Sequence, residues 1–233
     1  MRRSTSLCML AVVGLLFGIF GVPTASASLI GTVPTAPGST VVPGLVPPGT
    51  FPGTLLASLS APFASTLGTD SGTLISAVYA ESGGTLDFYY QLLNNPTGAK
   101  CGGAGQVACN PLSRLTDSSF DSVATSLGFR TDTGGPFVVG SVAPTTGDRN
   151  PGGDVVGFNF GPPESSKIAP GTNSDILVIS TDATTFSSGN ASVIDGGVAT
   201  VASFAPAPVP EPGSILLLAS GMLGMFAMRR PRR

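Results

Sequence analysis

The sequence predicts an all-β protein built as an antiparallel β-sandwich, of the jelly-roll or the immunoglobulin-like kind. Its 32 glycines and 21 prolines provide frequent turns, and only 10% of its residues are charged, which leaves few candidates for an amphipathic helix. Several segments also alternate apolar and polar residues with a period of two, the pattern of a strand with one buried face. We therefore expect roughly seven to ten strands separated by turns rich in Gly, Pro and Asn.

The clearest strand is expected at Thr85–Leu92, where one face is apolar and the other polar. The apolar face consists of Leu86, Phe88, Tyr90 and Leu92. Such a strand is half-buried, in a sheet whose other face meets water. Its neighbour is expected at Thr73–Tyr79, because Ser82–Gly84 can turn the chain back between the two segments.

Further strands are expected in the second half of the chain, from alternation or from short apolar runs bounded by turn residues. They are expected at Val123–Phe129, Val156–Phe160, Ser174–Thr181, Ala191–Ile194 and Val198–Phe204. The last two flank Asp195-Gly196-Gly197, residues that tolerate positive φ, so a hairpin or a bulged pair is expected there.

Composition divides the chain into four parts. They are a signal peptide at 1–27, a Pro/Gly-rich leader at 28–53, a β-sandwich ectodomain at 54–205 and a sorting and anchor segment at 206–233. The leader is expected to be extended and weakly ordered, because its prolines and glycines favour open backbone over packed structure. The body is long enough to bury one core.

The first 27 residues have the order of a secretory signal. Arg2 and Arg3 form the positive region, Cys8–Val22 is the apolar region, and Ala25–Ala27 is a small-x-small cleavage site. We expect the mature protein to begin at Ser28 and to reach the periplasm through the general secretory route.

The C-terminus combines Pro210-Glu211-Pro212, an apolar run at Ser214–Met228 and a basic end at Arg229–Arg233. As a helix the apolar run reaches about 22 Å, short of the ~30 Å hydrocarbon core of a bilayer. Snorkelling arginines and local thinning can cover the deficit, and the basic end favours the cytoplasmic side. The run is therefore expected to be a hydrophobic helix that anchors the chain with its body outside.

This C-terminus resembles the PEP-CTERM sorting signal of Gram-negative bacteria. The resemblance rests on Pro210, Glu211, Pro212 and Gly213, followed by the short apolar run and the arginine cluster. It implies recognition by an exosortase, a membrane-embedded cysteine transpeptidase that processes the protein near the motif. The competing interpretation is an ordinary membrane anchor preceded by a proline-rich linker.

The charges outside these targeting segments are mostly acidic. From Ser28 to Pro212, five basic residues stand against 13 acidic ones, a formal charge of −8. Such a surface repels phosphate backbones, so nucleic acid is not an expected partner. It suits a protein that is kept soluble outside the cell.

Two cysteines remain once Cys8 is removed with the signal peptide. Cys101 and Cys109 bracket a Gly-rich segment, and an exported protein meets an oxidising compartment. We expect a disulfide between them, which would stabilise a local loop by about 2.5 kcal/mol without determining the fold. Two free thiols are the alternative.

The chemistry of the chain is limited by its lack of histidine. Ser-His-Asp and Cys-His nucleophilic systems and the usual metal shells all need histidine, and no phosphate or dinucleotide loop is present. Glu81 and Asp87, which flank a turn, remain as weak candidates for the two carboxyls of a glycosidase. We therefore expect no enzyme activity and no cofactor.

Two weaker patterns could bind a ligand. Asp148, Asn150 and Asp154 place three oxygen-bearing side chains in a Gly-bent loop, which makes them weak calcium candidates against the simpler interpretation of an Asx-stabilised turn. Tyr79, Tyr89 and Tyr90 could form a platform for sugar stacking if they share an exposed face.

Taken together, these patterns predict an exported, non-catalytic surface or extracellular-matrix protein of a Gram-negative envelope. An exosortase is its expected partner, and the membrane holds it at least transiently. The alternative is a module that binds the polysaccharide of the extracellular matrix.

Overall fold

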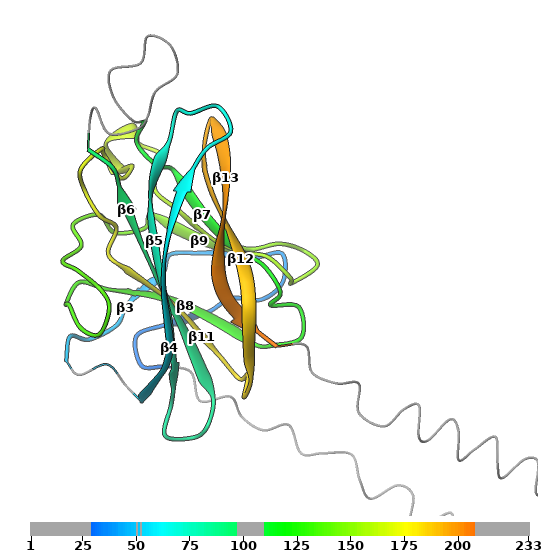
Figure 1. The fold of residues 1–233 in the computed structure, drawn as a ribbon. Helices are drawn as coiled ribbons and strands as arrows, with labels where there is room; N and C mark the ends of the chain where they lie inside the picture. The colour runs from blue at the N-terminus through cyan, green and yellow to red at the C-terminus, as the bar shows by residue number, and fades with distance from the viewer. Residues whose placement is uncertain (1–28, 50, 52, 97–109, 208–233) are drawn as a thin grey trace, which may run out of the picture.

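The computed structural model describes residues 29–49, 51, 53–96 and 110–207, which form two β-sheets (Figure 1). One 3₁₀ turn, η1 (Glu164–Ser166), interrupts the strands. The strands in chain order are β1 (Val33–Pro34), β2 (Thr40–Val41), β3 (Gly44–Leu45), β4 (Thr54–Ala64), β5 (Ser71–Ala80), β6 (Leu86–Asn94), β7 (Arg114–Asp117), β8 (Thr125–Arg130), β9 (Thr146–Arg149), β10 (Val156–Asn159), β11 (Ile176–Thr181), β12 (Phe186–Asp195) and β13 (Gly197–Pro206). The predicted all-β class is confirmed.

The two sheets contain seven and six strands. The larger sheet has the order β1-β8-β11-β6-β5-β4, with β3 added beside β8, and the smaller has the order β13-β12-β7-β10-β9-β2. The pairs are antiparallel except for β3 with β8, which is parallel. The arrangement is sandwich-like, because the main core is built from apolar side chains of both sheets.

That core follows the period-two pattern of the strands. From the larger sheet it takes Leu74, Val78, Leu86, Phe88, Tyr90, Leu92, Leu127, Leu177 and Ile179, and from the smaller sheet Leu115, Val156, Phe158, Ala191, Val193, Ala199, Val201 and Ala205. Phe120, from the loop after β7, meets Phe88 edge to face at 5.6 Å between ring centroids. Removing this much apolar surface from water is the main force that holds the two sheets together.

The predicted hairpins are confirmed. β5 and β6 pair across the turn at Ser82–Gly84, in the register Leu74↔Leu92 to Ala80↔Leu86. β12 and β13 pair over their whole length up to Asp195↔Gly197. Gly196 has φ +71°, the left-handed conformation that this tight turn requires.

The prediction that β6 is half-buried is wrong, because both of its faces are covered. On the outer face of the larger sheet, Tyr89 lies among Ile75, Ala77, Tyr79, Ile176 and Val178, and this outer cluster is closed by Val46, Phe51 and Phe137. Phe51 stacks on Tyr79 and Phe137 at 5.3 and 5.8 Å between ring centroids. Val46, Phe51 and Phe137, which come from segments outside the sheet, thus form a partial third layer.

The leader is the second departure from the prediction. Instead of a weakly ordered segment, residues 29–49 pair with the body, since β1 and β3 extend the larger sheet beside β8 and β2 extends the smaller sheet beside β9. Its glycines allow close packing: a Cβ atom on Gly44 would lie 1.8 Å from the carbonyl oxygen of Gly31. Extended Pro-rich backbone also matches the geometry of a sheet edge, where a missing N–H is tolerated. The folded body therefore begins well before residue 54.

Two other predictions concern residues outside the described part of the chain. They are the C-terminal hydrophobic helix at Ser214–Met228 and the Cys101–Cys109 disulfide. None of the described residues belongs to a helix with the length and hydropathy that a membrane span requires.

Candidate functional site

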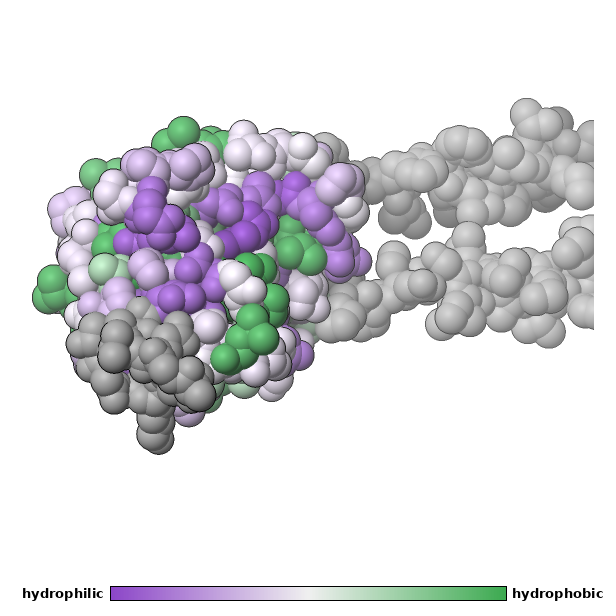
Figure 2. Space-filling view, turned by 90° about the horizontal axis from the view of Figure 1, so that it is seen from above, coloured by the Kyte–Doolittle hydropathy of each residue, from purple (hydrophilic) through white to green (hydrophobic). Residues whose placement is uncertain are grey.

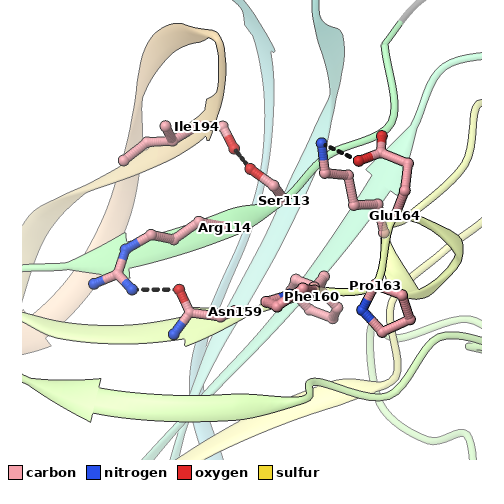
Figure 3. Close-up of a pocket in the computed structure, with 10 residues that line it drawn as sticks. Ser113, Arg114, Asn159, Phe160, Pro163, Glu164 and Ile194 are labelled. Atoms are coloured by element: carbon pink, nitrogen blue, oxygen red, sulfur yellow. Dashed lines mark hydrogen bonds and ion pairs between the residues drawn. The ribbon is translucent and has the colours of Figure 1, made fainter.

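A pocket of about 340 Å³ opens beside the smaller sheet, close to the β12–β13 turn (Figure 3). Strands β7, β10 and β12 supply part of its lining, and the segment from Phe160 to Lys167 supplies the rest. The lining residues are Ser113, Arg114, Asn159, Phe160, Gly161, Pro162, Pro163, Glu164, Lys167 and Ile194. Its volume matches the lower end of the range for small-molecule sites.

Arg114 and Asn159 form the polar wall of this pocket, and Asp148 on the next strand holds both of them from outside the lining. Arg114 on β7 donates to both carboxylate oxygens of Asp148 on β9, with Nη1–Oδ2 at 2.5 Å and Nη2–Oδ1 at 2.7 Å. Asn159 on β10 accepts from Arg114 (Figure 3) and donates to Asp148 Oδ2 at 2.8 Å. The hydrogen bonds from Arg114 lower the pKa of Asp148, so this carboxylate is ionised at neutral pH.

Gly157 makes this contact possible. It lies on β10 directly opposite Asp148 of β9, and the guanidinium of Arg114 crosses it to reach the carboxylate. A Cβ atom at position 157 would lie 2.4 Å from Nη2 of Arg114. Only glycine at position 157 leaves room for the Arg114 side chain to lie flat across the sheet.

Lys167 holds the opposite side of the pocket together. Its ammonium group lies 2.9 Å from Asp195 Oδ1 and 2.9 Å from Glu164 Oε2, so it links η1 to the β12–β13 turn. Hydrogen bonds to Asp195 and then Glu164 raise the pKa of Lys167. The ammonium group is therefore charged throughout the physiological pH range.

Both cations of the pocket are thus compensated by carboxylates within the site. Ser113, the hydroxyl group in the lining, donates to the carbonyl of Ile194 at 2.6 Å (Figure 3). Prolines, Phe160 and Ile194 add apolar surface beside these polar groups. Compensated charges next to apolar surface suit an uncharged polar ligand better than an anion.

The calcium candidates are only partly brought together. Asn150 and Asp154 meet across a turn, with Asn150 Nδ2 donating to Asp154 Oδ1 at 2.5 Å, whereas the carboxylate of Asp148 faces Arg114. The N–H of Val155 donates to Asn150 Oδ1 at 3.1 Å, as in an Asx-stabilised turn. Among the described residues, no three His, Cys, Asp or Glu side chains are gathered in a way that could hold a metal ion.

The tyrosines do not share an exposed face. Tyr79 and Tyr89 belong to the outer cluster and Tyr90 to the main core, and they are 4%, 0% and 1% exposed. A sugar ring therefore cannot stack on them, and the platform hypothesis is wrong. Val46, Phe51 and Phe137 cover the face of the sheet that carries Tyr79 and Tyr89, and Tyr90 lies on the opposite face, in the main core.

The structure does bring Glu81 and Asp87 together, with Glu81 half-buried and Asp87 completely buried. Burial, followed by the neighbouring Glu81 carboxyl, raises the pKa of Asp87. Glycosidase carboxyls must flank a cleft with a sugar between them, whereas these two contact each other. Their arrangement is that of two neighbouring carboxyl groups, one of which is buried.

Sequence reasoning missed Arg114, Asn159 and Lys167. Their partners lie at distant points of the chain, so no local spacing reveals the contacts. One signal was present: Arg114 and Lys167 are two of only five basic residues between Ser28 and Pro212. In a body so poor in cations, each one is a candidate for a structural or binding role.

The sorting motif Pro210, Glu211 and Pro212 lies beyond the described residues, and its evidence is the sequence itself. Residues 208–233 match the family model of the PEP-CTERM protein-sorting motif. No curated protein and no solved structure matches the chain. The motif identifies an exported protein of the cell envelope that is sorted and processed by an exosortase.

Proposed function

We propose that this chain is a non-catalytic surface or extracellular-matrix protein of a Gram-negative envelope, held at the membrane at least transiently by Ser214–Met228. The observation that carries the proposal is the sorting motif at 208–233, which directly follows a folded β body whose last described residue is Ala207. A compact body joined to a processing signal suits a protein delivered outside the cell as cargo.

The position of the pocket supports this proposal. Ile194 lies at the start of the β12–β13 turn, and the chain then runs along β13 (Gly197–Pro206) to Ala207. Ten residues of strand cover about 33 Å, so the pocket and Ala207, the last described residue, lie at opposite ends of the body. If the C-terminus is at the membrane, the pocket end faces outward.

The surface at that end is mainly polar. Figure 2, which views the molecule from above, shows hydrophilic residues in a broad band with separate hydrophobic residues between them. The formal charge of −8 between Ser28 and Pro212 also favours solubility outside the cell. Both features fit a protein that stays exposed to solvent after sorting.

The test is to replace Pro210-Glu211-Pro212 with Ala-Ala-Ala in a chain with a C-terminal tag. Two prolines hold an extended backbone that presents Glu211 for recognition, whereas the apolar run and the arginines suffice for membrane retention. The variant should be exported but should accumulate as a membrane-bound precursor that keeps its tag, detected by Western blot of cell fractions.

Pro208→Ala is the matched control, because it removes a proline just outside the tripeptide. It should be processed like the natural sequence. Equal tag removal in the triple variant, or no removal from any chain in cells with a cognate exosortase, would favour the plain membrane anchor instead.

A second candidate function is binding of matrix polysaccharide, and the pocket is the observation that favours it. Its compensated charges and apolar lining suit the hydroxyl groups and C–H faces of an uncharged sugar. Asn159→Ala should weaken binding on a glycan array, because Asn159 both accepts from Arg114 and donates to Asp148 in the polar wall.

Asn190→Ala is the matched control, since Asn190 is an exposed residue of β12 outside the pocket lining. Binding lost in both variants, or in neither, would show that the pocket is not the sugar site.

A further inference from the structure

Two neighbouring carboxyl groups, buried Asp87 and half-buried Glu81, lie at the outer face of the larger sheet. Asp87 on β6 is 0% exposed, and neither of its carboxylate oxygens has a hydrogen-bond partner among the described residues. Glu81, from the turn before β6, contacts it, and the Oε1 atom of Glu81 is likewise buried and unpartnered. Unpartnered carboxylate oxygens are costly in a protein interior, so this pair is a site prepared for a donor.

No cation among the described residues compensates this pair. Arg130 on β8, in the same sheet, has other partners: its guanidinium donates to Asp132 at 2.6 and 2.9 Å and to the carbonyl of Gly49 at 2.7 Å. It also lies 4.1 Å above the ring of Phe51. The other polar groups that face Asp87 are the hydroxyls of Ser180 on β11 and Tyr89 on β6, together with the backbone of Thr181. None of these carries a positive charge.

The start of the described chain lies beside this site. The N–H of Leu29 donates to Ser180 Oγ at 3.2 Å, and Ser180 is the direct cross-strand neighbour of Asp87. The carbonyl of Leu29 accepts from both the N–H and the hydroxyl of Thr32, at 3.1 and 2.7 Å, and its side chain packs against the outer cluster. Directly opposed side chains of antiparallel strands are about 5 Å apart, so Leu29 is fixed within a short distance of Asp87.

Cleavage after Ala27 would create a new charge at this place. The nitrogen of residue 28 is covalently held within about 4 Å of the Leu29 nitrogen. In the precursor it is a neutral amide, and in the mature protein it is a primary ammonium. We propose that the Glu81–Asp87 pair is a binding site for the α-ammonium group of Ser28, which is filled only after signal-peptide removal.

The electrostatics of the site agree with this assignment, which rests on the proposed export and cleavage. Burial, followed by the neighbouring Glu81 carboxyl, raises the pKa of Asp87 in the uncleaved chain. An ammonium group between the two carboxyls favours their ionised forms and offers three N–H donors to the unpartnered oxygens. Processing and folding are thereby coupled: the body becomes fully stable only when its N-terminus is free.

The test compares four exported, purified full-length chains. One has the natural cleavage site, one carries Gly-Ser inserted after Ala27, and the other two carry Asp87→Asn in each of these backgrounds. The insertion moves the ammonium by up to about 7 Å and leaves every described residue unchanged. We expect the α-amine of the natural chain to titrate at least about one unit above its ordinary pKa of 7.7–8.0, measured from the pH dependence of amine modification. The insertion should restore the ordinary value and lower the Tm by roughly 3–5 °C.

Asp87→Asn provides a reading that a merely structural role would not give. It should lower the Tm of the chain that begins at Ser28 but not that of the extended chain, where the carboxyl lacks its partner. Asp121→Asn, at an exposed position, should change neither. An ordinary amine pKa in the natural chain, or equal effects of Asp87→Asn in both backgrounds, would overturn the proposal.

Intact mass separates this result from failure of the cleavage prediction. If the exported protein does not begin at Ser28, cleavage after Ala27 is wrong. A chain released at Ser28 from a cleavable fusion then tests the ammonium site by itself, with the same amine titration and the same Tm comparison deciding the outcome.

Discussion

Asp117, at the end of β7, is a buried carboxyl group. Its replacement tests whether burial keeps this group protonated in the folded protein. Asp117 is 2% exposed, its Oδ1 atom accepts from the N–H of Ser118 at 2.8 Å, and its Oδ2 atom has no hydrogen-bond partner among the described residues. Burial raises the pKa of Asp117 to about 8, and the nearby Ser203 hydroxyl and Ser118 N–H only partly oppose this effect. We predict that Asp117→Asn stabilises the protein increasingly as the pH rises.

The sign follows from proton binding. Between pH 4 and pH 8 the folded protein keeps a proton on Asp117 that the unfolded chain releases, so the free energy of unfolding falls as the pH rises. The limit is about 1.4 kcal/mol per pH unit, or about 4 kcal/mol from pH 4 to pH 7. Asparagine is neutral at every pH, so its burial does not become less favourable as the pH rises. Its side-chain oxygen can still accept the hydrogen bond from the N–H of Ser118.

Urea unfolding at pH 5, 6, 7 and 8 measures the effect. The difference in free energy of unfolding between Asp117→Asn and the natural sequence should grow by about 1 kcal/mol per pH unit. Asp121→Asn, an exposed substitution four residues away, should show a small and nearly constant difference. A constant difference for Asp117→Asn as well would mean that Asp117 is already ionised in the folded protein, and the argument from burial would be refuted.

Three further predictions concern loops and the pocket. Non-reducing peptide mapping should find Cys101 bridged to Cys109, and replacing both with serine should lower the free energy of unfolding by about 2.5 kcal/mol without unfolding the body. Two alkylatable thiols in the exported protein would contradict it. Arg149→Ala should lower the free energy of unfolding in urea by about 2–4 kcal/mol, because the buried guanidinium of Arg149 donates to three backbone carbonyls at 2.6–2.8 Å. A loss below about 0.5 kcal/mol would show that water replaces these hydrogen bonds. Gly157→Ala should lower the free energy of unfolding by about 1–3 kcal/mol, because the added methyl group displaces Arg114. A crystal structure of the variant with Arg114 still bound to the Asp148 carboxylate would contradict this steric argument.

Local patterns predicted most of the long strands. The alternation of Leu86, Phe88, Tyr90 and Leu92 required one of the two faces of β6 to be apolar, and those four residues are in the main core. The β12–β13 hairpin was predictable because Asp195-Gly196-Gly197 permits the backbone that such a turn needs. Period and turn chemistry are properties of neighbouring residues, so they can be read without the fold.

The leader and the tyrosines show where local patterns fail. A Pro/Gly-rich segment has the same composition whether it is a loose linker or a set of short edge strands, and pairing with β8 and β9 decides between them. The polar-looking face of β6 carries Tyr89, which is buried because Phe51 and Phe137 lie over it. No property of β6 itself indicates that other segments cover it.

The sequence alone determined where the protein is sent. The motif at 208–233 is a short linear signal, so it is identified from its residues and their order alone. Only the tertiary structure decided the sites on the body. Arg114 meets Asp148 across 34 positions and Lys167 meets Asp195 across 28, because each pair is joined by the packing of strands and turns far apart in sequence. In the same way, Leu29 reaches Ser180, the cross-strand neighbour of Asp87, across 151 positions. Such contacts form because many weak interactions between distant parts of the chain together favour one arrangement of the sheets. A short stretch of sequence does not show which arrangement that is.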